Sequence, residues 1–348
     1  MKQIVPIIMD SSFVKLAPID DYISLIWTSR YYEVGDFELV VNANKVNMGL
    51  FVQGNYIMRE DDENVGIIED IKIQSNEDLS DMLIVTGRFL ASILGRRIIY
   101  PQTNVNYSLD TVIDRLIVLN IIFPSILQRR ILNFRLGTHS IMSRNVQAQF
   151  DGENLLETIS ELCKTYGVGM KVVLNSSHEF VFSLYQGADH TYNQSERPYI
   201  VFSTDYDNLH SSEYEENYRS VVTAVLVAGE GEGVDRKTAW ATDGETGLNR
   251  YELYDDTKNI SSNDGQISDA DYQKLLEEAG KESLTRYTTA FSGSVSFDNI
   301  KYREDVNLGD LCVIKNPRWG LSINARLLEV IESVAETGEY SIVPTFGV

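Results

Sequence analysis

The chain has only two cysteines, Cys163 and Cys312, among its 348 residues. They lie far apart in the sequence, Cys163 on the apolar face of an expected helix and Cys312 inside an expected strand. We therefore expect two reduced thiols in the protein core. Such thiols are typical of a protein that folds in the cytoplasm.

Long apolar runs are also missing. The longest, residues 116–127, is interrupted by Asn120 and Pro124 and is too short to cross a bilayer. The first ten residues contain one lysine, and their apolar run is broken by Pro6, so no secretion signal is expected. The sequence therefore predicts a protein without a membrane span.

Positive charge is scarce. Lysine and arginine total 30 against 51 aspartates and glutamates, a net charge of −21. A chain this acidic repels phosphate backbones and anionic lipid surfaces, which argues against a protein whose main role is to bind nucleic acid. Apolar residues make up 43% of the chain, enough to build real cores, so a disordered chain is also excluded.

Histidine is rare too, and the usual catalytic motifs are missing. The four histidines are His139, His178, His190 and His210. None stands four residues from another on an expected helix, and no cysteine lies near them at the spacing of a zinc site. The Gly-x-Ser-x-Gly motif of serine hydrolases does not occur. We therefore expect no metal and no catalytic residues.

One motif invites a cofactor interpretation. The glycine-rich residues 229–233 (GEGEG) follow an expected strand, as in the first turn of dinucleotide-binding folds. However, Glu230 and Glu232 would place negative charge where a pyrophosphate binds, and no amphipathic helix follows to hold the anion. We expect no cofactor here, and interpret the motif as a flexible turn or an interface loop.

The pattern along the chain is mostly β, with an α+β segment in the middle. Residues 1–100 contain short stretches rich in β-branched and aromatic residues, and alternation around Trp27 places this side chain in a core. Residues 101–194 contain two amphipathic helices and a hairpin, and are expected to form an α+β insert domain with its own core.

The second half returns to β structure. We expect residues 195–228 to complete the first β domain and residues 229–290 to form an acidic loop region followed by a helix. Ser268 is expected to cap this helix, since it begins the pattern of a capping box. Residues 291–348 are expected to form a second β domain.

The two β domains share a sequence echo. Residues 46–49 (VNMG) match residues 306–309 (VNLG) at an offset of 260 residues. The same offset places residues 68–71 over residues 328–331, and each of these is followed by a polar turn and a closing strand. The echo predicts two similar β barrels or sandwiches, one near each end of the chain.

Cations cluster at one place in this acidic chain, with Arg88, Arg96 and Arg97 close together in sequence. They can be surface arginines whose aliphatic stems cover apolar neighbours. Alternatively, they pair with acidic faces of neighbouring subunits, since the planar guanidinium binds a carboxylate with two hydrogen bonds. Together with Glu230 and Glu232, they form our candidate subunit interface.

Several segments resemble a known family. Residues 22–31 (YISLIWTSRY), continuing to residues 35–39 (GDFEL), resemble the opening of siphovirus minor tail proteins of the ReqiPepy type. Further segments resemble this family in the same order along the chain, namely residues 66–69, 87–90, 96–97, 229–231 and 338–347. The family in turn is similar to hub proteins at the tip or baseplate of phage tails and related injection particles.

The resemblance implies two tube-like β domains per subunit and a homotrimer whose six domains form a pseudo-sixfold ring. Such a ring joins the sixfold tail tube to a threefold spike or fibre. The implied partners are the distal tail or tube protein, the spike or fibre, and the tape measure protein, with DNA passing through the ring without specific binding. The implied location is the virion tail tip or baseplate, after assembly in the host cytoplasm.

The resemblance provides no catalytic positions. Related tail-tip proteins often carry a C-terminal peptidase or lysozyme domain, and this sequence stops after its last expected hairpin, so we expect that activity to be absent or on another chain. The predicted function is therefore a structural hub and not an enzyme. Two alternatives stay open at this point. One is a cell-wall hydrolase, and the other is a host-surface binding module that uses residues 101–194 or 229–266.

Overall fold

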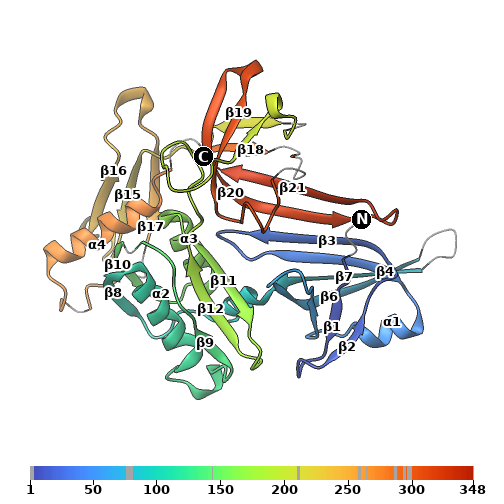
Figure 1. The fold of residues 1–348 in the computed structure, drawn as a ribbon. Coiled ribbons are helices and arrows are strands. Elements are labelled where there is room, and N and C mark those ends of the chain that lie inside the picture. Colours follow the sequence, from blue (N-terminus) through green and yellow to red (C-terminus); the bar gives the residue numbers. More distant parts are fainter. Residues whose placement is uncertain are drawn as a thin grey trace.

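The structure is a computed structural model that describes residues 4–75, 81–142, 144–209, 212–257, 260–263, 265–285, 288–292, 295 and 300–347. Its largest feature is a sheet of 13 strands that connects an N-terminal β unit with a C-terminal β unit (Figure 1). The described residues also form three smaller sheets and four α-helices. The fold is therefore mostly β with α+β additions, as the sequence predicts.

The N-terminal unit consists of strands with alternating apolar residues, so that one face of the sheet packs into a core. On that face Leu25, Trp27, Phe37 and Leu39 are buried together. The ring of Trp27 lies 4.7 Å from that of Phe89, and the prediction that Trp27 is a core residue is confirmed. The elements of this unit are β1 (Ile7–Met9), β2 (Lys15–Pro18), β3 (Tyr22–Arg30), β4 (Asp36–Asn42), α1 (Lys45–Leu50), β5 (Tyr56–Met58), β6 (Val65–Ser75) and β7 (Asp81–Phe89).

The next segment folds into the predicted helices and hairpin. The N-cap of its second helix is Asn154, whose side chain accepts hydrogen bonds from the amides of Leu156 and Glu157. This helix ends at Gly167, whose φ of 68° suits glycine. The elements are η1 (Leu90–Arg96), β8 (Thr103–Ser108), α2 (Leu109–Ile117), η2 (Val118–Ile122), η3 (Leu127–Arg129), β9 (Phe134–Leu136), β10 (Asn145–Phe150), α3 (Leu155–Tyr166), β11 (Gly169–Leu174) and β12 (Phe180–Tyr185).

This α+β segment has a large core of its own, which continues into the N-terminal unit. The apolar faces of α2 and α3 pack with the β11–β12 hairpin, and Val65 and Ile67 of β6 belong to the same cluster of buried residues. Cys163 of α3 is buried in it, as predicted. The shared core attaches the segment firmly to the first unit.

The prediction for residues 195–228 requires a correction. These residues were expected to complete the N-terminal unit, but β13 (Val201–Ser203) pairs with β19 (Leu311–Asn316), and β14 (Glu213–Asn217) pairs with β18 (Thr288–Ser292). Both strands therefore belong to the C-terminal unit. The other elements of this unit are η4 (Thr204–Tyr206), η7 (Pro317–Trp319), β20 (Leu321–Val334) and β21 (Tyr340–Gly347).

A small three-stranded sheet covered by one helix lies beside the C-terminal unit. As the capping box predicts, the Ser268 hydroxyl accepts a hydrogen bond from the amide of Asp271 and donates one to its carboxylate. Tyr272 and Leu276 of this helix are buried against the sheet. The elements are β15 (Ala224–Ala228), η5 (Gly233–Asp235), β16 (Thr238–Thr242), η6 (Gly247–Asn249), β17 (Glu252–Asp256) and α4 (Asp269–Glu282).

The two β units are not separate closed barrels. Residues 329–334 of β20 pair antiparallel with residues 25–30 of β3, which merges both units into one open sheet. Figure 1 shows this seam, where the red C-terminal strands lie beside the blue N-terminal strands. Within the described residues no sheet closes on itself, so of the two predicted forms, barrels or sandwiches, a closed barrel within one chain is not what the units adopt.

The two units contain the same hairpin in the same register. Val334 and Tyr340 face each other at the tip of β20–β21, as Ser75 and Asp81 do in β6–β7, 259 residues earlier. The correspondence holds through the whole ladder. It includes a β-bulge, which falls between residues 68 and 70 in β6 and between residues 327 and 329 in β20. A shared bulge is a strong sign of a shared fold, because a bulge fixes both register and twist.

The correspondence extends to the neighbouring strands. The order β3-β4-β7-β6-β5-β1 in the first unit matches β14-β18-β21-β20-β19-β13 in the second. Across the matched strands, Trp27, Phe37 and Gly87 stand opposite one another, as do Tyr214, Phe291 and Phe346. One difference is that β1 pairs antiparallel with β5, whereas β13 pairs parallel with β19. The predicted internal repeat is thus present as a repeat of six strands.

The echo that suggested the repeat does not itself mark equivalent positions. Residues 46–49 lie in α1, where Val46 is 71% exposed, whereas residues 306–309 form a bridge and turn in which Val306 is buried. The strands repeat at an offset of 259 and not 260. A shift of one residue matters, since it exchanges the two faces of a strand.

Candidate functional site

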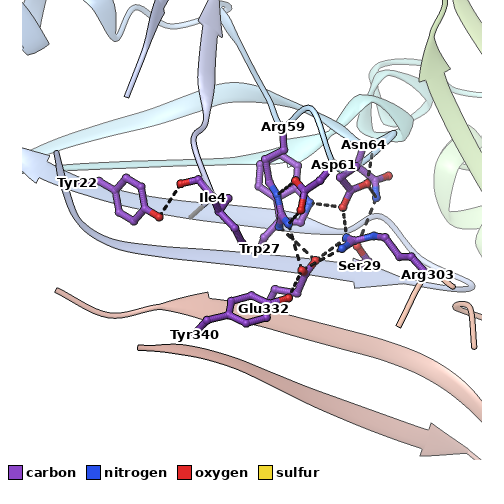
Figure 2. Close-up of polar contacts among 11 residues, drawn as sticks. Ile4, Tyr22, Trp27, Ser29, Arg59, Asp61, Asn64, Arg303, Glu332 and Tyr340 are labelled. Carbon is purple, nitrogen blue, oxygen red and sulfur yellow. Dashed lines mark hydrogen bonds and ion pairs between the residues drawn. The ribbon is translucent and has the colours of Figure 1, made fainter. Parts of the chain in front are cut away.

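The seam between β3 and β20 covers a buried network of charged side chains (Figure 2). Its centre is Glu332 of β20, which is 2% exposed and stands opposite Trp27 of β3. The other members come from the chain between β5 and β6 and from the chain before β19. Four segments that are distant in sequence therefore meet at one point.

Arg59 binds two carboxylates at once. Its Nε and Nη2 donate to the two carboxylate oxygens of Asp61 at 2.9 and 2.8 Å, and its Nη1 and Nη2 donate to Glu332 at 3.2 and 3.1 Å. The side chain is fully buried, and its guanidinium lies 5.4 Å from the ring centre of Trp27. Burial alone would lower the pKa of Arg59, but the two carboxylates raise it above its usual value.

Arg303 is the second cation of the network. Its Nη1 donates to Glu332 at 3.0 Å, and its Nη2 binds Glu332 and Asp62. Its backbone φ is 70°, a left-handed conformation that costs a non-glycine residue on the order of 1 kcal/mol. The side chain is therefore held in place by its ion pairs against an unfavourable backbone. Trp27 donates its indole N–H to Asp62 at 2.9 Å and completes the contact with β3.

The carboxylates respond differently to burial. Burial would raise the pKa of Glu332, but hydrogen bonds and charge from Arg303 and Arg59 hold it below its usual value. For Asp62 burial prevails over the attraction of Arg303, and the pKa lies above its usual value. The Tyr340 hydroxyl donates to Glu332 at 2.6 Å, and burial together with this carboxylate raises the pKa of the phenol. Glu332 is thus a permanent anion at neutral pH.

This arrangement suits mechanical coupling of the two β units. Each cation is saturated by carboxylates, so neither is free to bind a substrate. Removing one partner of such a buried pair leaves an uncompensated charge and costs about 3–5 kcal/mol. The network therefore opposes any opening of the seam between the two units.

A cavity of about 510 Å³ lies next to the network, between the two β units and the α+β segment. Three cations line it, and each is paired: Arg30 with Asp36 and Glu329, Lys171 with Glu63, and Arg303 with Asp62 and Glu332. Among the residues that the structure describes, the cavity thus offers an anionic ligand no free cation.

The predicted interface arginines have partners within the chain. Arg88 on β7 binds both carboxylate oxygens of Glu69 on β6, at 2.7 and 2.9 Å. Arg97 donates to the carbonyl of Arg129 at 3.0 Å and to that of Arg96, while the Arg96 side chain is exposed. The structure shows these contacts within one chain; contact of the three arginines with another subunit remains a prediction.

The two predicted interface glutamates behave differently. Glu230 follows β15 and accepts hydrogen bonds from the Ser261 hydroxyl at 2.7 Å and from the amide of Ser262. Partial burial opposes the effect, but these donors lower the pKa of Glu230. Glu232 is exposed. The glycine-rich motif is therefore an ordered turn between β15 and β16, with its first glutamate fixed by serines.

The described residues contain no grouping of three or more histidine, cysteine, aspartate or glutamate side chains placed to hold a metal. His139 accepts the amide of Leu184 on Nδ1 at 3.0 Å, and its Nε2 lies 2.8 Å from Asp114. His210 lies outside the described residues. Burial raises the pKa of the Cys163 thiol to about 12, which makes it a poor nucleophile. No helix in the described part of the chain has the length and apolar character needed to cross a membrane.

The sequence reasoning missed the ion network. A signal was present in residues 330–334 (VIESV), where Glu332 occupies an inward position of an alternating strand. A buried acid at such a position demands a cation. Its identity could not be read from the sequence, because Arg59 is 273 residues away.

Comparisons with known proteins agree with this architecture. The tail protein from Neisseria meningitidis MC58 matches with a TM-score of 0.60 and 14% identity, over 100% of this chain and 97% of that one. The 43 kDa tail protein of prophage MuSo2 from Shewanella oneidensis matches with a TM-score of 0.56 and 14% identity, over 99% and 97%. The prophage tail protein gp18 from Listeria monocytogenes EGD-e matches with a TM-score of 0.51 and 12% identity, over 99% and 94%.

These identities are low, so the three structures establish a shared fold. No curated protein sequence matches the chain significantly. The family described as Siphovirus ReqiPepy6 Gp37-like protein, in contrast, matches residues 6–348. The chain therefore belongs to this family of siphovirus tail proteins, as the resemblance in its sequence indicates.

Proposed function

We propose that this tail protein is a structural hub of the tail tip or baseplate. In this proposal three copies form a ring that joins the sixfold tail tube to a threefold spike or fibre. The observation that carries the proposal is the strand-by-strand repeat of the two β units. A subunit with two like units places six of them around a threefold axis, which fits both symmetries.

A hub of this kind needs its two units at a fixed angle, because an error in that angle would accumulate around the ring. The β3–β20 seam supplies six residue pairs of continuous sheet, from Glu329↔Arg30 to Val334↔Leu25. The network around Glu332 adds ion pairs beneath that seam. Both features support a rigid two-unit building block.

The proposed partners follow from this role. The distal tail or tube protein would contact one face of the ring, the spike or fibre the other, and the tape measure protein would end near it. The proposed place is the tail tip or baseplate of the virion, after assembly in the host cytoplasm. The role requires no enzymatic step, and the saturated ion pairs and buried thiols described above support a structural protein.

The net charge of −21 suggests how DNA would pass. If the acidic residues gather at the lumen, they repel the phosphate backbone and prevent it from adhering. The electrostatic potential of an assembled ring tests this point, and a basic lumen would contradict it.

The native mass of the purified protein tests the proposal. Across a concentration series we expect a species of three times the 39.4 kDa of one chain. A dimer or tetramer, or a monomer at every concentration, would contradict the ring. A peptidoglycan zymogram serves as a second measurement, in which the hub predicts no clearing and a clearing zone would favour a cell-wall hydrolase.

A further inference from the structure

Part of the backbone edge of strand β6 is not covered by any strand that the structure describes. Residues 65–67 pair with β5 on one side, and residues 66–75 pair with β7 on the other. Along residues 70–75, the side opposite β7 has no strand of the described residues next to it. Such an edge is a template for the addition of another strand.

Strand β14 has the second free edge. It pairs with β18 and is the last strand of the large sheet in the part of the chain that the structure describes. Three of its five residues are exposed glutamates: Glu213, Glu215 and Glu216. Like charges facing each other would discourage β14 from pairing with a copy of itself, while a strand with a cation would suit it.

The chain itself shows how these two edges fit together. In the C-terminal unit, β19 covers residues 321–326 of β20, and β3 pairs with residues 329–334 farther along the same edge. In the N-terminal unit, β5 covers the start of β6 in the same way, and no described strand takes the position that corresponds to that of β3. The repeat makes residues 70–75 equivalent to residues 329–334, and β14 equivalent to β3.

We propose that β14 of one copy adds antiparallel to residues 70–75 of β6 in the next copy, at the register of the β3–β20 seam. This inference rests on the proposed ring and names the strands that would close it. In the seam within the chain, Trp27 stands opposite Glu332. Transferred by the repeat, this register places Tyr214 of one copy opposite Ile73 of the next.

The side chains suit this register. It places Glu215 opposite Lys72, which is exposed and is the only cation among residues 70–75. Opposite charges directly across a ladder stabilise strand pairing, whereas like charges at the same positions destabilise it. Ile73 is 50% exposed in the single chain, and contact with the Tyr214 ring would cover it.

The proposed contact is heterologous, since one copy supplies β14 and the other supplies β6. Such contacts form either a closed ring or an open filament, depending on the rotation at each step. Because the new seam copies the seam within the chain, the rotation from unit to unit is expected to be nearly the same at all six steps. Three copies then make one continuous ring of sheet.

Paired cysteines in the full-length chain test the register. Lys72→Cys with Glu215→Cys, and Ile73→Cys with Tyr214→Cys, each place two thiols directly opposite across the proposed seam. Adjacent pairs in an antiparallel ladder alternate between wider and closer spacing, so at least one pair is expected to meet the geometry of a disulfide. Under mild oxidation we expect at least half of the protein to run as a covalent trimer on a non-reducing gel, and to return to monomer with reductant.

The same four substitutions provide matched controls. Lys72→Cys with Tyr214→Cys, and Ile73→Cys with Glu215→Cys, place the thiols on opposite faces of the sheet, so we expect no covalent trimer. A native trimer in which neither test pair forms cross-links, or in which the controls form them equally, would overturn the seam and leave the ring standing. A covalent ladder that continues beyond three would support the seam and overturn the ring. A monomer without cross-links would overturn both.

Discussion

Glu332→Gln is the most informative single substitution in the seam between the β units. The change keeps the shape of the side chain and removes its charge, which leaves Arg59 and Arg303 with less compensation in a buried place. Breaking a buried ion pair costs about 3–5 kcal/mol. For a chain of 348 residues, whose unfolding entropy is about 2.1 cal/mol/K per residue, we expect the melting temperature to fall by roughly 5 °C.

Differential scanning calorimetry of the purified chain measures this effect. The matched control is Glu304→Gln, which removes the same charge from the pair with Lys301, where both side chains are more than half exposed. Solvent screens an exposed pair, so it contributes little, and the control is expected to melt within about 2 °C of the original chain. Equal shifts for the two variants would refute the reasoning that the network holds the units together.

A milder substitution tests the same network in case Glu332→Gln does not fold. Tyr340→Phe removes one hydrogen bond of 2.6 Å to Glu332 and keeps both arginine contacts. We expect a cost of about 1–2 kcal/mol, which lies between the control and Glu332→Gln. A cost at or below that of Glu304→Gln would show that the network contributes little.

Two further predictions concern pH and the bulge of the hairpin. The folded pKa of Glu332 lies below the ordinary 4.5, so the stabilisation by its charge is present above pH 4.5 and is lost as the pH falls through the folded pKa. The difference in the free energy of unfolding between the original chain and Glu332→Gln should therefore shrink in acid. A difference that grows as the pH is lowered would contradict this prediction. At the bulge, a Cβ on Gly87 would lie 1.8 Å from the carbonyl oxygen of Ile67, so Gly87→Ala should lower the free energy of unfolding in urea by at least about 2 kcal/mol. The control is Gly49→Ala in α1, where a Cβ would have no atom within 4 Å, and this substitution should be neutral or slightly stabilising. Equal effects of the two alanines would show that β6 and β7 do not approach so closely at Gly87.

Local patterns in the sequence predicted the local elements well. The helices α2, α3 and α4 lie in the segments whose apolar period indicates them, Ser268 caps α4 as expected, and Trp27 is buried as the alternation requires. These features depend on residues within about one or two turns of each other, so a single sequence contains the information.

Long-range pairing was predicted poorly. The assignment of residues 195–228 to the first unit was wrong, because β13 joins β19 in a parallel pair more than 100 residues away, and no local signal marks such a partner. The repeat was found, but at an offset one residue too long, since the matched letters at 46–49 lie in a helix that has no counterpart at 306–309. The ion network shows the same limit, because its members become neighbours only after the two units pair.

The central claim is that two like β units in each chain let three copies imitate a sixfold ring. Electron cryo-microscopy of the assembled protein tests it most directly. The account predicts a threefold ring in which six similar β units follow one another at nearly equal angles and β14 of each copy lies beside β6 of the next. A particle with twofold symmetry, or a threefold particle whose two β units lie at different radii, would contradict it.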